Sequence, residues 1–110
     1  MGGGLPAARS PDDHAWHLYP LRLSLDRIAI DRARFIEELR LRGVGASVHF
    51  IPLHLHPFYR ERFGIGPGLC PVAEAAYERL LTLPMFPAMG REEVEDVVAA
   101  LTKVLRHYER

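Results

Sequence analysis

The sequence predicts a small α+β domain, a two-layer sandwich in which helices pack on one face of a mainly antiparallel sheet of about three strands. Two segments with alternating or continuous apolar residues and one short extended segment predict the strands. Segments with helical periodicity lie between and after them, and the last of these is the most regular. A chain of 110 residues has room for one modest core of two packed layers.

The chain is expected to begin with a tail and then a strand. Residues 1–13 are rich in Gly, Pro, Ala and Asp and are predicted to form a flexible tail or a cut linker, so that the domain spans 14–110. Leu21, Leu23 and Leu25 alternate with Arg22 and Ser24, and this pattern predicts a strand over residues 16–25 with one buried face.

A helix and a second strand follow. Asp31 is suited to cap a helix that runs to about Arg42, and Gly43 is a natural stop. In this helix we expect Phe35, Ile36 and Leu39 to face inward, and Arg34, Glu37, Glu38 and Arg42 to face outward. Residues 46–51 are predicted to form the second strand, which ends at a proline because proline has no N–H to donate to the sheet.

The second half of the chain is predicted to be mostly helical. Residues 54–63 suit one or two turns of helix, and Pro71 opens a helix to about Leu81, with proline in the first turn where its missing N–H costs least. Residues 82–87 form a short extended segment. The last helix carries apolar residues at helical spacing from Val94 to Leu105, with acidic residues at its start and basic residues at its end.

Composition limits the partners of this protein. The 14 basic and 14 acidic side chains give a formal net charge of zero, which argues against nucleic acid or an anionic membrane as the main partner. Cys70 is the only cysteine, so no disulfide forms within the chain, and this fits the reducing cytoplasm. The N-terminus lacks the basic start and the apolar centre of a signal peptide, and no apolar run is long enough to span a bilayer.

Three histidines in eight residues mark a candidate site. His49 ends the predicted second strand, and His54 and His56 follow the proline after it. Their imidazoles could contact the phosphate or hydroxyl groups of a ligand, bind a metal, or satisfy backbone groups in a turn. No cysteine or acidic residue lies near them in the sequence, so the pattern matches no familiar metal motif. Tyr59 follows, with its hydroxyl expected to face a cleft.

The neighbouring aromatic residues are predicted to be structural. Phe58, Tyr59 and Phe63 lie at helical spacing, which favours packing in a core over a stacking platform. A separate feature is that the chain has one lysine. This residue, Lys103, lies near the end of the last predicted helix.

Four blocks of sequence, in order, resemble the C-terminal part of the DegT/DnrJ/EryC1/StrS aminotransferases. They are Ala15-Trp-His-Leu-Tyr-Pro-Leu-Arg-Leu23, Gly43-Val-Gly-Ala-Ser-Val-His-Phe-Ile-Pro-Leu-His54, Pro71-Val-Ala-Glu-Ala-Ala-Tyr-Glu-Arg-Leu-Leu81 and Leu83-Pro-Met-Phe-Pro87. The family consists of pyridoxal-phosphate enzymes that place an amino group on keto sugars carried by nucleotides. The resemblance covers residues 14–106.

The resemblance implies the small C-terminal domain of the aspartate-aminotransferase fold. It implies an N-terminal large domain, missing here, that holds pyridoxal phosphate and its Schiff-base lysine, a nucleotide-sugar substrate, and a cytoplasmic homodimer. Lys103 does not match the cofactor lysine, so this chain alone is expected to bind no cofactor and to catalyse no transamination. His49, His54 and Tyr59 are implied to bind substrate on one wall of the cleft. Phe50 stands where family members often have tyrosine.

Two alternatives remain at this stage. The first is a stand-alone module that binds a nucleotide or a sugar without pyridoxal-phosphate chemistry. The second is a small metal-dependent enzyme built on the histidine cluster.

Overall fold

The computed structural model describes residues 3–8, 10, 12 and 14–110, and within them one antiparallel sheet with two helices packed on it. The strand order is β1-β2-β4-β3, where β1 is Gly3–Gly4, β2 is Tyr19–Leu23, β3 is Ser47–Val48 and β4 is Leu80–Leu83. The central pair, β2 and β4, runs antiparallel with Leu21 opposite Leu81. The predicted α+β class and the antiparallel sheet of about three strands are therefore confirmed, with the two-residue β1 as an added edge.

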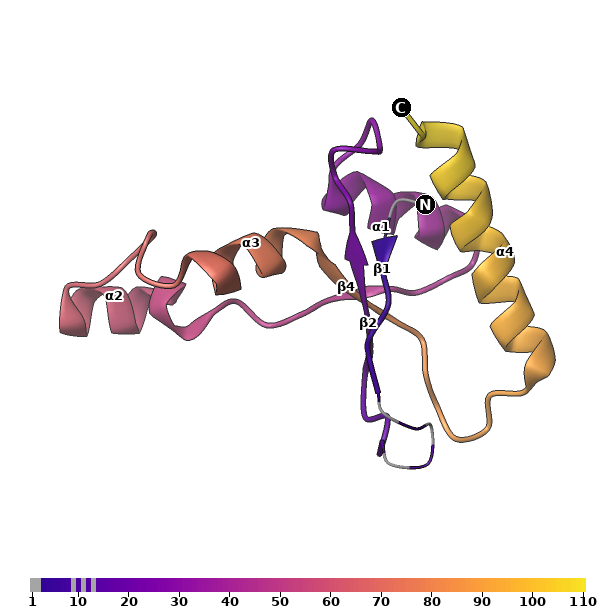
Figure 1. The fold of residues 1–110 in the computed structure, drawn as a ribbon, viewed down its shortest axis with the longest axis horizontal. Coiled ribbons are helices and arrows are strands. Elements are labelled where there is room, and N and C mark those ends of the chain that lie inside the picture. Colours follow the sequence, from indigo (N-terminus) through magenta and orange to yellow (C-terminus); the bar gives the residue numbers. More distant parts are fainter. Residues whose placement is uncertain (1–2, 9, 11, 13) are drawn as a thin grey trace.

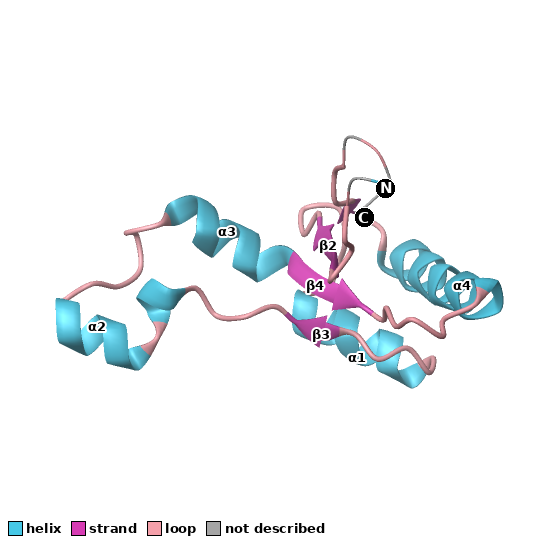
Figure 2. Cartoon of the chain, turned by 90° about the horizontal axis from the view of Figure 1, so that it is seen from below, coloured by secondary structure: helices cyan, strands magenta, loops and turns pink. Residues whose placement is uncertain are grey.

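The two helices that form the second layer are α1, Arg32–Leu41, and α4, Arg91–Tyr108. Both lie on the same side of the sheet in two views (Figures 1 and 2). The core between helices and sheet consists of Leu21, Leu23, Ile28, Phe35, Leu39, Val44, Leu81, Leu83, Ala100 and Val104. Burial of this apolar surface is the main favourable term that holds the domain together.

Local chemistry explains where α1 begins and ends. The side chain of Asp31 accepts a hydrogen bond of 2.8 Å from the backbone N–H of Arg34, which satisfies one of the free donors in the first turn. After the helix, Gly43 has φ +80°, a left-handed conformation in which glycine is favoured because it has no Cβ. The predicted cap at Asp31 and the predicted stop at Gly43 are confirmed.

The chain between β3 and β4 leaves the sheet and forms a projecting arm, defined here as residues 49–79. The arm contains η2, Leu53–Leu55, α2, Pro57–Phe63, and α3, Pro71–Arg79. In Figure 1 it extends away from the sheet and from α1 and α4, and Figure 2 shows the same separation from below. Since none of the residues of α2 or α3 is buried, the arm contributes little to the core.

Two local predictions were wrong, and two residues of the N-terminal segment pair with the sheet. Leu80 and Leu81, expected at the end of a helix, begin β4, where Leu81 is fully buried. Glu38, expected to face outward, is only 6% exposed because it binds partners from two helices. In the N-terminal segment expected to be a loose tail, Gly3 and Gly4 pair with Leu23 and Arg22 of β2.

The described residues contain no helix that combines the length and the apolar character needed to cross a bilayer.

Candidate functional site

The sheet presents one face to α1 and α4 and leaves the other face without these helices. In a strand, successive side chains point to opposite faces, and residues paired across antiparallel strands share a face. Leu21 and its partner Leu81 face the core. The register therefore places Arg22 of β2, Thr82 of β4 and Ser47 of β3 on the opposite face, which we call the open face.

His49 lies beside this open face. It follows β3 directly, and its Nδ1 lies 3.3 Å from Oγ1 of Thr82. Since a hydroxyl can both donate and accept, this contact suits either neutral tautomer of the imidazole. Nε2 of His49 has no hydrogen-bond partner among the described residues. The arrangement holds one ring nitrogen against the sheet and leaves the other without a hydrogen-bond partner among the described residues.

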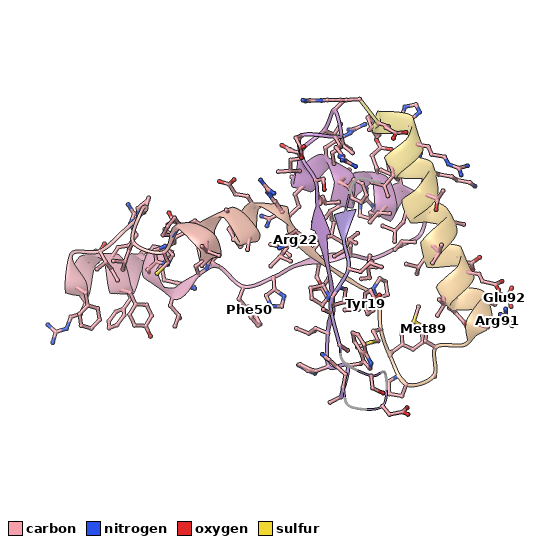
Figure 3. All side chains as sticks on the ribbon, in the orientation of Figure 1. Tyr19, Arg22, Phe50, Met89, Arg91 and Glu92 are labelled. Carbon is pink, nitrogen blue, oxygen red and sulfur yellow. The ribbon has the colours of Figure 1, made fainter. Side chains whose placement is uncertain are left out.

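Phe50 extends the same surface beyond His49. The two rings lie 5.9 Å apart with a tilt of 51°. Phe50 is 86% exposed, and Figure 3 shows it on the connection between the sheet and the arm. An exposed aromatic ring next to a half-buried imidazole provides an apolar surface beside a hydrogen-bonding group, as binding sites for ring-shaped ligands commonly do.

His54 occupies a different environment, inside the arm. It is 7% exposed, and its Nε2 lies 3.3 Å from Oε2 of Glu74 in α3 without the geometry of a hydrogen bond, so that Nε2 is buried and unsatisfied. Both carboxylate oxygens of Glu74 accept from the N–H of Gly68, at 2.9 and 3.1 Å. This backbone hydrogen bond, and after it the contact with His54, lowers the pKa of Glu74 below its ordinary value. Glu74 therefore contacts both His54 of η2 and the loop before α3.

Tyr59 belongs to an exposed aromatic surface on α2. Its ring lies 5.2 Å from that of Phe58, edge to face, and 6.3 Å from that of Phe63, stacked. Phe58 and Phe63 are 66% and 63% exposed. The prediction that these aromatics form core was wrong, because α2 projects from the domain and none of its residues is buried.

The three predicted site residues therefore lie on three successive parts of the chain: His49 directly after β3, His54 in η2 and Tyr59 in α2. Among the described residues, no hydrogen bond or ion pair joins His49, His54 or Tyr59 to one another. Thr82 and Glu74 are the polar partners that sequence reasoning missed. They lie 33 and 20 positions from their histidines, and no spacing pattern in the sequence connects them.

The residues of this chain do not fit pyridoxal phosphate. Lys103 is exposed and lines a groove of about 430 Å³ between α4 and the end of α1, together with Arg42, Glu93 and Asp96. The carboxylates of Glu93 and Asp96 line the same groove and disfavour the phosphate of the cofactor, and the groove is open rather than an enclosed apolar pocket around the lysine. Within the described part of the chain, no three His, Cys, Asp or Glu side chains are placed to hold a metal ion.

Comparison with known proteins agrees with the fold. A sequence model of the DegT/DnrJ/EryC1/StrS aminotransferase family matches residues 3–102. Among curated proteins, the uncharacterized protein MJ1066 of Methanocaldococcus jannaschii is 52% identical over 100 residues, covering 91% of this chain and 26% of the relative. The spore coat polysaccharide biosynthesis protein SpsC of Bacillus subtilis is 36% identical over 102 residues, covering 92% and 26%.

Solved structures give the same result. The DesV protein of S. venezuelae, determined in complex with a ketimine intermediate, superposes with a TM-score of 0.79 at 30% identity, over 96% of this chain and 27% of that one. The putative sugar aminotransferase Spr1654 of Streptococcus pneumoniae gives a TM-score of 0.81 at 25% identity, over 97% and 27%. The chain thus spans about a quarter of the length of the proteins it matches.

Proposed function

The chain belongs to the DegT/DnrJ/EryC1/StrS aminotransferase family, and we propose that residues 14–110 form the C-terminal small domain of an enzyme that transfers an amino group to a nucleotide-linked keto sugar. Residues 1–13 are then the tail or linker that leads into it. Such sugars supply cell-surface polysaccharides or antibiotics. The observation that carries the proposal is the contact between His49 and Thr82 at the open face of the sheet. The chain also spans only about a quarter of the length of its relatives, as a single domain of a longer enzyme would.

In this proposal the chain forms one wall of the substrate cleft, and the remaining part of the longer protein forms the other. That part holds pyridoxal phosphate and the lysine that carries it, since the residues of this chain do not fit the cofactor. The isolated chain therefore binds no cofactor and transfers no amino group. The complete enzyme is then a cytoplasmic homodimer.

His49 orients the substrate. Its Nδ1 is held by Thr82, so its Nε2 is directed to a ligand and forms a hydrogen bond with a sugar hydroxyl or a phosphate oxygen. Phe50, with 86% of its surface exposed, provides an apolar surface for a ring of the substrate beside that hydrogen bond. Because Phe50 has no hydroxyl, it cannot supply the hydrogen bond that a tyrosine would make there.

Tyr59 and His54 have different parts in this proposal. Tyr59 is 36% exposed and can offer its hydroxyl to the substrate. His54 was expected to face the substrate as well, but its burial and its contact with Glu74 favour a positioning role. It would hold η2 and the following α2 at the angle that directs Tyr59 toward the cleft.

A chimeric enzyme tests the proposal. Residues 3–110, which include the whole of α4, replace the matching quarter of full-length MJ1066, a relative that is 52% identical to this chain over 100 residues. Parent and chimera are then assayed for pyridoxal-phosphate absorbance and for amino transfer to a panel of nucleotide-linked keto sugars. We expect the chimera to retain both properties of the parent.

The control is the parent protein without its C-terminal quarter, which should retain no transfer activity. A chimera that folds and binds the cofactor, but lacks an activity that the parent has, would contradict the proposed function. A parent enzyme that remains active without this quarter would contradict it too.

A further inference from the structure

A second polar surface lies at the open face of the sheet, in a groove between α3 and β2. The groove has a volume of about 350 Å³ and is lined by Arg22 of β2 and by Pro71, Val72, Ala75, Ala76 and Arg79 of α3. Figure 3 shows Arg22 between the sheet and the end of α3 nearest to it. Two guanidinium groups from different elements therefore line a groove whose other walls are small and apolar.

The backbone explains why both arginines reach this groove. The alternation in β2 buries Leu21 and Leu23 and directs Arg22 to the other face. On α3, Val72, Ala75 and Arg79 are spaced by three and four residues, so they share one side of the helix.

Gly4 of β1 leaves room for the guanidinium of Arg22. A Cβ atom at Gly4 would lie 3.3 Å from Nη2 and 3.4 Å from Nε of Arg22, which is close contact. Since Gly4 pairs directly with Arg22 in the sheet, a larger residue would press on this side chain. The glycine therefore leaves space for the guanidinium of Arg22 close to the backbone of β1.

Neither arginine has a carboxylate partner among the described residues, whereas several other arginines do. Arg34 and Arg42 bind Glu38, Arg40 binds Glu37, and Arg91 binds Glu95. Glu74, the acidic residue of the first turn of α3, is engaged by Gly68. The groove is thus lined by two positive charges and by no acidic residue.

We propose that this groove binds a small molecule through a phosphate or diphosphate group, held by Arg22 and Arg79. Guanidinium groups match phosphate oxygens in geometry, and their charge-assisted hydrogen bonds are about twice as strong as neutral ones. Val72 and Ala75 cover the adjoining apolar part of the ligand. The inference concerns this chain alone and does not depend on the proposed aminotransferase function.

The test is a titration of the isotope-labelled chain with sodium pyrophosphate, followed by the Nε–Hε resonances of arginine in NMR spectra. We expect saturable shifts of the Arg22 and Arg79 signals that weaken as salt is added. Arg22→Gln and Arg79→Gln should each weaken binding by about tenfold, as expected for the loss of one charge-assisted hydrogen-bonding group. The double variant should not bind.

The matched control is the double variant Arg62→Gln/Arg106→Gln, which removes the same charge from exposed positions on α2 and α4. It should bind pyrophosphate as the unchanged chain does. The inference is overturned if pyrophosphate gives no saturable shift, or if both double variants weaken binding equally. It is also overturned if glutarate binds as tightly as pyrophosphate, because the groove would then select dicarboxylates.

Discussion

Tyr108, the last residue of α4, donates a hydrogen bond of 2.9 Å from its hydroxyl to Oε1 of Glu38 in α1. The same carboxylate accepts from Arg34 at 2.6 Å and from Arg42 at 2.8 Å. Glu38 therefore connects the two helices of the second layer through a residue 70 positions further along the chain. Its burial is compatible with its charge because each carboxylate oxygen has a hydrogen-bonding partner.

Replacement of Tyr108 by phenylalanine tests this connection. The ring remains to pack on the core, but the hydrogen bond to Glu38 is lost. We expect the midpoint of thermal unfolding to fall by about 5 °C, the usual effect of one hydrogen bond in a domain of this size. Tyr77→Phe is the control, since no described residue hydrogen-bonds to the hydroxyl of Tyr77, and it should unfold at the temperature of the unchanged chain. Equal midpoints for Tyr108→Phe and Tyr77→Phe would contradict the connection.

Glu38 also predicts how stability depends on pH. The hydrogen bond from Arg42, and after it that from Tyr108, lowers the pKa of Glu38 in the folded chain below its ordinary value of about 4.3. A lowered folded pKa stabilises the fold above the unfolded value, and this contribution is lost as pH falls through the folded value. The chain should therefore lose stability below about pH 4.

The variant Glu38→Gln isolates this effect. It removes the titrating group, so the midpoint of thermal unfolding should change less between pH 7 and pH 3 than it does in the unchanged chain. Glu92→Gln, at an exposed position in the first turn of α4, serves as control and should leave the pH dependence intact. The attribution to Glu38 fails if its variant follows the same pH curve as the control.

Burial predicts different losses of stability when two phenylalanines, one buried and one exposed, are replaced by alanine. Phe35 is fully buried beneath the sheet, so Phe35→Ala should lower the free energy of unfolding by about 3–5 kcal/mol through lost burial and a cavity. Phe63 is 63% exposed on α2, and Phe63→Ala should change it by less than about 1 kcal/mol. Urea unfolding curves of the two variants measure the difference. Similar losses in both would mean that α2 packs on the domain.

Glu74 predicts a local change in the arm. In Glu74→Ala the N–H of Gly68 loses both of its acceptors, and the buried His54 loses its neighbouring charge. The amide of Gly68 should then exchange with deuterium faster, while amides of α1 and α4 keep their rates. Glu78→Ala, exposed on the same helix, is the matched control. Unchanged exchange at Gly68 would show that Glu74 does not hold the loop.

Sequence patterns predicted the features of the fold that depend on residues close together in the chain. The apolar spacing of α4 and α1, the cap at Asp31 and the stop at Gly43 all depend on neighbours within one helix, so the sequence alone predicts them. The end of α3 was predicted wrongly, because a short apolar run such as residues 80–83 suits a helix and a strand equally. Its pairing with β2 and β3 makes it a strand.

The arm shows why the rest could not be predicted. The spacing of Phe58, Tyr59 and Phe63 signals an apolar helix face but not what covers it, and here these rings are exposed. For the candidate site, the sequence predicts His49 but not its neighbour Thr82, since a single threonine in a strand carries no distinguishing pattern. The burial of Glu38 could not be predicted either, because its partner Tyr108 lies 70 positions further along the chain.

The central claim is that His49 orients a nucleotide-linked sugar on the open face of the sheet. In the chimera with MJ1066, His49→Ala should leave cofactor absorbance unchanged and lower kcat/KM for the nucleotide-linked keto sugar by at least about tenfold, the usual effect of one lost substrate hydrogen bond. His107→Ala, exposed near the end of α4, is the matched control and should keep the activity of the chimera. Equal kcat/KM in the two variants would contradict the claim.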